Sequence, residues 1–343
     1  MSAYTVPRPG DKNWIFAAMP VIKSKYKAPF LFRNYHISTI YASMLRKVPP
    51  VAQKRERLDL SDGDFIDLDF SFSSETPPLG IIIILHGLEG NAKRPYVLGM
   101  AKKFIAEGWD VAAVNFRGCS GEINRLFRSY NAGASEDLRE VISYILNKKK
   151  YGKIGLVGFS LGGNLMLKYL GEGNELPQEI IAAVAISTPC DLHRSLKKLE
   201  EPQNLIYSRR FVKKLKNQLL LRQAHFPGNL DKKEISACRS LYSIDELYTG
   251  KAHGFESALD YYEQSSALNF IPNIKTPTLL INARNDGFLS ENSSPVELAK
   301  DNSCFFLEMP EYGGHVGFIQ EGITTYTEDR AFEFMTERDE NFK

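Results

Sequence analysis

The chain has 343 residues, 43% of them apolar and 24% charged, and its formal net charge is +2. This composition argues against a disordered chain and against a protein that crosses a membrane several times. A charge so close to zero gives no reason to expect nucleic acid or an anionic membrane as the main partner. The length suits two average domains or one large α/β domain with an insertion.

Residues 1–55 mix proline, aromatic and basic residues without a sustained period, and we expect them to wrap the core of the protein. The first residues, 1–12, lack the basic and apolar regions of a secretory signal. No stretch reaches 18 uninterrupted apolar residues, the length that indicates a membrane-spanning helix. The sequence therefore predicts a soluble cytoplasmic protein without an integral membrane segment.

A pattern of strands begins after this segment. Residues 57–60 and 65–70 alternate in polarity around a Ser-Asp-Gly-Asp turn, which predicts a β-hairpin. Residues 81–85 form an unbroken branched apolar run, as a strand buried on both faces of a parallel sheet requires. Similar runs follow at 111–114, 154–157, 180–186 and 278–281.

Helical patterns long enough for crossover connections lie between the early strands, at 96–107, 136–148 and 161–171. This alternation predicts the α/β class, with a mostly parallel twisted sheet and helices on both faces. The alternation stops at residues 190–275, which we interpret as a mostly helical cap or lid insertion, because a structureless loop of that length is improbable. It resumes with a strand at 278–282, a helix near 294–301, a strand at 304–309 and a closing helix from about 327.

These patterns divide the chain into an N-terminal wrapping segment, a core in two parts and a cap inserted between them. The predicted boundaries are 1–55 for the wrapping segment, 56–189 and 276–343 for the core, and 190–275 for the cap.

Ser160 lies in Gly-x-Ser-x-Gly, between a predicted strand and a predicted helix. This motif is typical of a nucleophile elbow, in which glycines without a Cβ allow the strand to turn sharply into the helix. A serine hydroxyl is a weak nucleophile, so it needs a histidine to accept its proton and a carboxylate to orient that histidine. The expected order along the chain is serine, acid, histidine.

His315 is the predicted base, because it follows a core strand near the C-terminus and has glycines around it, unlike the other downstream histidines, His193, His225 and His253. Asp286 is the predicted acid, since it comes at the end of the strand at 278–282, where open α/β sheets gather functional groups. Asp191 follows the preceding strand and stays an alternative.

Two backbone N–H groups are expected to bind the oxyanion of the tetrahedral intermediate, those of Leu88 and Leu161. Leu88 follows the strand at 81–85 in a glycine-containing loop, and Leu161 follows the serine at the start of a helix, whose dipole favours negative charge. We expect His86 to form hydrogen bonds within its loop rather than to carry a proton. The segment 117–122 is expected to shape the floor of the pocket.

No metal or cofactor is expected. The cysteines are widely spaced, without a Cys-x-x-Cys pair or clustered histidines, so we interpret Cys119, Cys190, Cys238 and Cys304 as free thiols. A nucleophilic Cys119 is disfavoured because no base is assigned to it. The glycines from 158 to 163 have neither the dinucleotide-binding spacing nor a Walker lysine, which argues against oxidoreductases and nucleotide hydrolases.

The start of the predicted cap is rich in basic residues, namely Arg194, Lys197, Lys198, Arg209, Arg210, Lys213, Lys214, Lys216 and Arg222. We interpret this run mainly as a solvated helix face; the alternative is weak contact with anionic lipid or capture of an acidic substrate. Nearby apolar residues either line an acyl pocket or attach the cap to the core. They are Leu205, Phe211, Leu215, Leu219, Leu220 and Leu221.

Several of these motifs together resemble the YheT-like esterase family of the α/β-hydrolase superfamily, related to eukaryotic abhydrolase-domain lipases and to yeast medium-chain ethyl ester synthase/esterases. The resemblance runs from about residue 30 to residue 334. Its most specific pieces are the segments 86–90, 115–122, 158–164 and 313–318. The resemblance implies an α/β-hydrolase fold, a triad of Ser160, Asp286 and His315, and hydrolysis of short- or medium-chain acyl esters.

The chain departs from the family pattern at two places. Where the family has Asp-Asp-Pro-Phe at the acid, this chain has Asn285, Asp286, Gly287 and Phe288. The family motif resembling Asn-Gly-His-Leu-Gln-Thr-Ile is Asn-Tyr-His-Ile-Ser-Thr-Ile at 34–40 in this chain.

Our leading hypothesis is therefore a serine carboxylesterase that acts on a small-molecule acyl ester. The alternatives are an acyltransferase that passes the acyl group to an alcohol, and a non-catalytic binding protein that retains the fold. The sequence does not indicate an oligomeric state.

Overall fold

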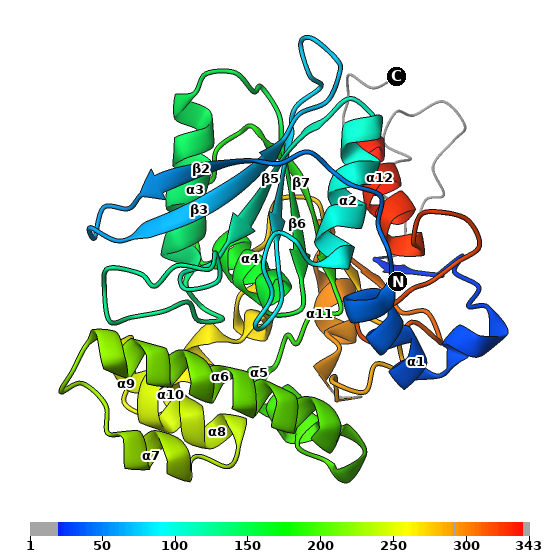
Figure 1. Cartoon of the computed structure of the whole chain (residues 1–343). Helices are drawn as coiled ribbons and strands as arrows, with labels where there is room; N and C mark the ends of the chain where they lie inside the picture. The colour runs from blue at the N-terminus through cyan, green and yellow to red at the C-terminus, as the bar shows by residue number, and fades with distance from the viewer. Residues whose placement is uncertain (1–19, 291–292, 339–343) are drawn as a thin grey trace, which may run out of the picture.

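The computed structural model of the chain describes residues 20–290 and 293–338. The prediction that residues 1–55 wrap the core falls partly outside the described residues, because residues 1–19 are not among them. The absence of a secretory signal was predicted from residues 1–12, which also lie outside them. Within them, a nine-stranded sheet has the order β1-β9-β8-β7-β6-β4-β5-β3-β2 (Figure 1). The strands are β1 (Val21–Ile22), β2 (Lys54–Asp59), β3 (Phe65–Ser71), β4 (Ile81–Leu85), β5 (Asp110–Asn115), β6 (Ile154–Phe159), β7 (Ile180–Ile186), β8 (Thr278–Ile281) and β9 (Phe305–Glu308).

The sheet is mostly parallel. Strands β1, β9, β8, β7, β6, β4 and β5 run parallel, whereas β3 pairs with β5, and β2 with β3, in antiparallel register. Each residue of β4 is at most 1% exposed, as the apolar run in its sequence predicts for a strand covered on both faces. The predicted hairpin is β2 and β3, and each predicted core strand is present within one residue of its expected start.

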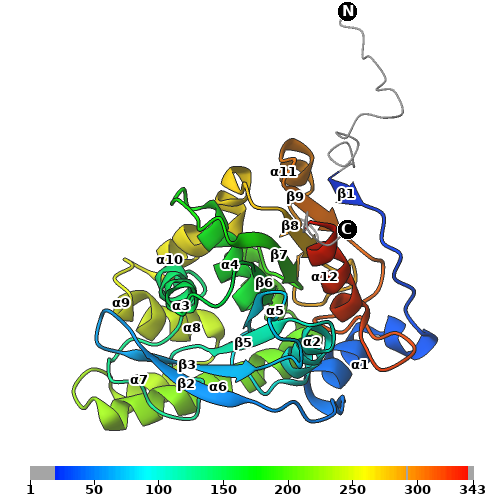
Figure 2. The same cartoon turned by 90° about the horizontal axis from the view of Figure 1, so that it is seen from above.

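Helices cover both faces of the sheet, as the alternating pattern predicts (Figure 2). One face packs against α2 (Pro95–Ala106) and α12 (Tyr326–Glu337). The other packs against α3 (Ser135–Asn147), α4 (Leu161–Gly171) and α11 (Val296–Asp301). Two separate apolar cores result, one between each helical layer and the sheet.

The segment between β7 and β8 is mostly helical and lies below the sheet in Figure 1, so the structure has the predicted helical cap. Its core contains Val212, Leu219, Ile235, Leu241 and Ile244. The helices are α5 (Leu192–Leu199), α6 (Leu205–His225), α7 (Lys232–Ala237), α8 (Leu241–Ile244), α9 (Gly250–Ala252) and α10 (Ala258–Ser265), with short turns η4 (Pro202–Asn204), η5 (Asp245–Thr249), η6 (Ala267–Asn269) and η7 (Ile271–Asn273).

The interpretation of the basic cap residues as a solvated face is wrong for Arg222. This side chain is buried, and its Nη1 donates to the backbone oxygens of Leu126, Phe127 and Arg128 at 2.9–3.0 Å. A buried guanidinium with these acceptors holds α6 against a core loop, because its removal would take the donor from the Leu126 and Arg128 oxygens, whereas Phe127 would keep its hydrogen bond from Tyr248 Oη. The arginine therefore joins cap and core.

The described part of the N-terminal segment is more ordered than its sequence suggested. It contains β1, then η2 (Phe30–Arg33), α1 (Tyr35–Ile40) and η3 (Tyr41–Leu45). In Figure 1, α1 lies beside the C-terminal part of the core. Across the described ranges 20–290 and 293–338, we find no helix with the length and apolar character needed to span a bilayer.

Candidate active site

Ser160 stands at the turn between β6 and α4, with φ 51° and ψ −121°. A non-glycine residue held at positive φ is strained, and such strain is typical of a nucleophile elbow. The surrounding glycines make room for this turn. A Cβ on Gly158 would lie 2.6 Å from Gly163 Cα, and a Cβ on Gly162 would lie 2.5 Å from the His86 oxygen. The elbow therefore requires glycine at both positions.

The structure brings Ser160, His315 and Asp286 into one hydrogen-bonded chain. Ser160 Oγ is 2.9 Å from His315 Nε2, and His315 Nδ1 is 2.9 Å from Asp286 Oδ2. Asp286 is 3% exposed and His315 7% exposed, and the other carboxylate oxygen accepts from the Phe288 N–H at 2.9 Å. A neutral imidazole with its proton on Nδ1 fits both contacts, because it donates to the aspartate and accepts from the serine hydroxyl.

The alternative acid and the other histidines lie elsewhere. Asp191 caps the N-terminus of α5 by accepting from the Arg194 N–H at 2.9 Å. His253 contacts the backbone oxygens of Thr249 and Ser129, each at 2.8 Å. Asp286, at the end of β8, is the carboxylate that contacts His315.

The loop that carries His315 is held by residues that sequence reasoning did not single out. The His315 N–H donates to Thr39 Oγ1 at 2.9 Å, and Ser38 Oγ donates to the Gly313 oxygen at 2.9 Å. The Val316 N–H donates to Ser187 Oγ at 2.9 Å. Because Ser38 and Thr39 belong to α1, the N-terminal segment positions the histidine. The family motif at 34–40 was the available signal for this contact.

The two proposed oxyanion donors both lie beside Ser160. Leu161 is the first residue of α4, where backbone N–H groups have no acceptor within the helix. Leu88 follows Gly87, where a Cβ would lie only 3.5 Å from Ser160 Oγ, so this loop lies against the serine. Among the described residues, no acceptor is found for the Leu88 N–H.

The Leu88 loop is fixed by its neighbour Glu89, which has φ 54°. Its N–H donates to Tyr130 Oη at 2.9 Å, and the Tyr130 hydroxyl donates to Glu89 Oε1 at 3.1 Å. Arg94 Nη2 donates to the Glu89 carbonyl oxygen at 2.6 Å. These contacts hold the Leu88 amide in one orientation, as a preorganised donor requires.

His86 forms hydrogen bonds within its loop, as expected, and also across to the next strand end. Its Nδ1 donates to the Gly87 oxygen at 2.7 Å, and its Nε2 accepts from the Phe116 N–H at 3.2 Å. Burial lowers the pKa of His86 to about 4. The ring is therefore neutral and fully engaged, which argues for a structural role.

Acidification is expected to destabilise the fold through His86. Its pKa is about 4 in the folded protein against an ordinary value of 6.5, so the unfolded state binds more protons between these pH values. The free energy of unfolding should fall as the pH drops through this window, by up to about 3 kcal/mol from this residue. Urea unfolding should show a shallower pH dependence for His86→Asn, whereas His225→Asn, at an exposed position, should keep the wild-type slope. Equal slopes for His86→Asn and wild type would contradict this assignment.

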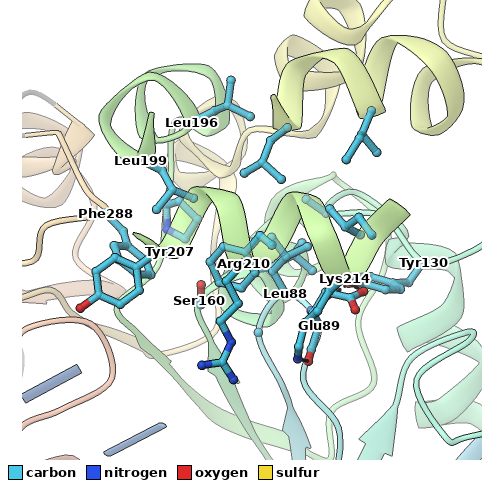
Figure 3. A pocket seen from close by; sticks show the side chains of 18 of the residues that line it. Leu88, Glu89, Tyr130, Ser160, Leu196, Leu199, Tyr207, Arg210, Lys214 and Phe288 are labelled. Atoms are coloured by element: carbon cyan, nitrogen blue, oxygen red, sulfur yellow. Dashed lines mark hydrogen bonds between the residues drawn. The ribbon is translucent and has the colours of Figure 1, made fainter. Parts of the chain in front are cut away.

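Ser160 lines a cavity of about 470 Å³ between the sheet and the cap. Figure 3 shows Leu196, Leu199 and Phe288 toward one end of this cavity, and Glu89 and Lys214 toward the other. Most of the wall is apolar, and about half of its residues come from the cap helices. Of the apolar cap residues considered from the sequence, Phe211, Leu215 and Leu219 line the cavity, whereas Leu221 is 56% exposed.

The segment 117–122 contributes less to this cavity than its sequence suggested. Arg117 and Gly118 reach its wall, but Cys119 does not. The Arg117 guanidinium is buried and pairs with Asp137 and Asp62, so its main contacts are structural. Burial raises the pKa of the Cys119 thiol, which argues against a nucleophilic role. Among residues 20–290 and 293–338, no group of three or more histidine, cysteine or acidic side chains could hold a metal ion.

Comparison with known proteins agrees with this architecture. The sequence profile of the family described as "alpha/beta hydrolase fold" matches residues 80–322. The Escherichia coli (strain K12) protein YheT, which is named as an esterase, is 33% identical over 292 residues, or 84% of this chain and 85% of that protein. This chain belongs to the YheT-like esterase family of the α/β-hydrolase superfamily.

More distant relatives of this YheT-like chain include human phospholipase ABHD3, which is 29% identical over 91% of this chain and 78% of that protein. A similar solved structure is the Pyrococcus furiosus esterase Pf2001, with a TM-score of 0.57 and 20% identity over 84% of this chain and 92% of that one. At this identity the likeness concerns the fold alone. The predicted α/β-hydrolase fold is confirmed, and the family is one of esterases and lipases.

Proposed function

We propose that this protein hydrolyses carboxylic esters of short- to medium-chain acids through an acyl-enzyme on Ser160. The observation that carries the proposal is the hydrogen-bonded chain from Ser160 through His315 to Asp286. Ser160 and His315 line a largely apolar cavity. In this arrangement Ser160 can attack a carbonyl, His315 can move the proton, and Asp286 can stabilise the imidazolium that forms.

In the proposed reaction, Ser160 Oγ attacks the ester carbonyl while His315 Nε2 accepts the hydroxyl proton. The N–H groups of Leu88 and Leu161 stabilise the negative oxygen of the tetrahedral intermediate. His315 then gives the proton to the departing alcohol, and the acyl group stays on Ser160. A water molecule, deprotonated by the same histidine, releases the acid and restores the hydroxyl.

The cap supports a preference for apolar acyl groups. Leu196, Leu199 and Leu219 line the cavity that contains Ser160, and the cavity volume of about 470 Å³ lies in the usual range for small-molecule sites. The names of the relatives, esterase and phospholipase, are consistent with carboxylic ester substrates.

A fluorophosphonate probe tests the nucleophile directly. We expect the wild-type protein to be labelled on Ser160 and the Ser160→Ala variant to remain unlabelled, with loss of p-nitrophenyl ester hydrolysis. A chain-length series should show the highest kcat/KM for short or medium acyl groups. Product analysis with added alcohol distinguishes hydrolysis from acyl transfer. A hydrolase would release mainly the free acid, whereas a transferase would release mainly the ester of the added alcohol. Labelling that persists in Ser160→Ala would contradict the assignment.

A further inference from the structure

A second cavity, of about 460 Å³, adjoins the one that contains Ser160. The two share wall residues from the loop that follows Leu88, from the N-cap of α2, from the loop after β5 and from α6. They are Glu89, Arg94, Gly118, Lys214 and Gln218. The second cavity has a different chemistry, because its other lining residues are polar or small. They include Arg55, Asn91, Lys93, Asn115, Ser120 and Asn217. A largely apolar cavity, called the apolar chamber below, and a more polar one therefore meet beside Glu89.

Two cations, Arg94 and Lys214, line the shared wall. Within the part of the chain that the structure describes, neither Arg94 nor Lys214 forms an ion pair. Arg94 donates to the backbone oxygen of Glu89 at 2.6 Å, and Lys214 Nζ lies 3.5 Å from the same oxygen. Arg55 differs, because Asp69 holds its guanidinium at 2.6 Å. Arg94 and Lys214 thus have hydrogen-bonding capacity left for a ligand.

Glu89 is the acid that interacts with these cations, but among the described residues its carboxyl forms no ion pair with either of them. The Glu89 carboxyl accepts a hydrogen bond from Tyr130. Burial raises its pKa, whereas Tyr130 and the nearby Lys214 and Arg94 lower it. Burial and the neighbouring Arg94 both lower the pKa of Lys214. One carboxyl group thus faces two cations on the wall shared by the cavities, which leaves positive charge there that an anion would offset.

We propose that the paired cavities bind an amphiphilic ester whose alcohol portion carries an anionic group, a phosphate or a carboxylate, held by Arg94 and Lys214. The acyl chain occupies the apolar chamber beneath the cap, and the scissile carbonyl lies over Ser160 between the two chambers. This inference rests on the proposed function. It adds a substrate class and names two residues that determine specificity.

A matched pair of substrates tests the anion site. The first is 1-octanoylglycerol, and the second is 1-octanoylglycerol 3-phosphate, both kept at concentrations where they are monomeric. We expect kcat/KM to be at least about tenfold higher for the phosphate ester, since hydrogen bonds to a charged group are stronger than those between neutral groups. Lys214→Gln should lower this ratio by about tenfold. Lys213→Gln removes an exposed lysine from the next position of α6, outside both cavities, and should leave the ratio unchanged.

A second pair places the anion on the acyl side. The mono-p-nitrophenyl ester of suberic acid should be a poorer substrate than p-nitrophenyl octanoate, because its carboxylate would enter the apolar chamber. A preference for the suberate ester, or equal kcat/KM values for the two octanoylglycerols, would overturn the proposal.

Binding separates a failure of this inference from a failure of the proposed function. In Ser160→Ala, calorimetry should still show tighter binding of the phosphate ester than of the neutral one, and Lys214→Gln should remove that difference. If the fluorophosphonate probe does not label Ser160 but the phosphate ester still binds more tightly than the neutral one, the anion site is supported and the hydrolase proposal is wrong. If Ser160 is labelled but the two esters bind equally tightly, the anion site is wrong and the hydrolase proposal is unaffected.

Discussion

Replacing Asp286 with asparagine is expected to lower kcat for ester hydrolysis by about 10⁴-fold, while the protein remains folded. Asparagine keeps an oxygen for the Phe288 N–H, which now contacts Oδ1 at 2.9 Å. Its NH2 group would then face His315 Nδ1, where the carboxylate now accepts. The imidazole would have to accept on Nδ1 and carry its proton on Nε2, so it could no longer take the proton of Ser160.

The measurement is kcat for a p-nitrophenyl ester, with the melting temperature as a check of folding. Asp191→Asn is the matched control, because this residue was the alternative acid and the structure gives it a capping role on α5. Since asparagine also caps helices well, we expect its kcat to stay within about threefold of wild type. A large loss of kcat in Asp191→Asn, or a small one in Asp286→Asn, would reverse the assignment of the acid.

The sheet and the elbow were predictable because their signals are local. The run at 81–85 has branched apolar side chains at every position, and only a strand covered on both faces buries them all. Gly158 and Gly162 flank Ser160 in sequence, and the same glycines make the turn sterically possible. In both cases the residues that determine the structure lie within a few positions of one another.

The parts that sequence reasoning missed depend on contacts between distant segments. Thr39 accepts from the backbone of His315, 276 positions away, and no periodicity in either segment indicates this contact. Arg222 resembles its exposed basic neighbours in sequence, yet it is buried because a core loop presents three carbonyl groups to it. The shared wall of the two cavities likewise joins Arg94 and Lys214 from separate elements. Tertiary packing, rather than local pattern, decides these features.

The two departures from the family pattern meet in the folded protein. Tyr35 stands where the family motif has glycine, and Gly287 stands where it has proline. A Cβ on Gly287 would lie 2.2 Å from the Tyr35 ring, so the tyrosine fills the space that a larger residue at 287 would need. Asn204 joins the pair, since its Nδ2 donates to the Gly287 oxygen at 2.5 Å and its Oδ1 accepts from the Tyr35 hydroxyl at 3.3 Å. The departures are therefore complementary, and they lie next to Asp286.

Gly287→Ala is accordingly expected to lower kcat/KM by at least about tenfold and the free energy of unfolding by about 1–3 kcal/mol, the usual cost of overpacking. The clash would push either Tyr35 or the Asp286 loop out of place. Tyr35→Gly in the same chain removes the ring and should restore much of the loss, giving a coupling free energy of about 1–2 kcal/mol in a double-mutant cycle. The cycle is measured by urea unfolding and p-nitrophenyl ester kinetics on the wild-type protein, Gly287→Ala, Tyr35→Gly and the double variant. Additive effects would show that the two positions act independently, and the complementary packing would then have no part in holding Asp286.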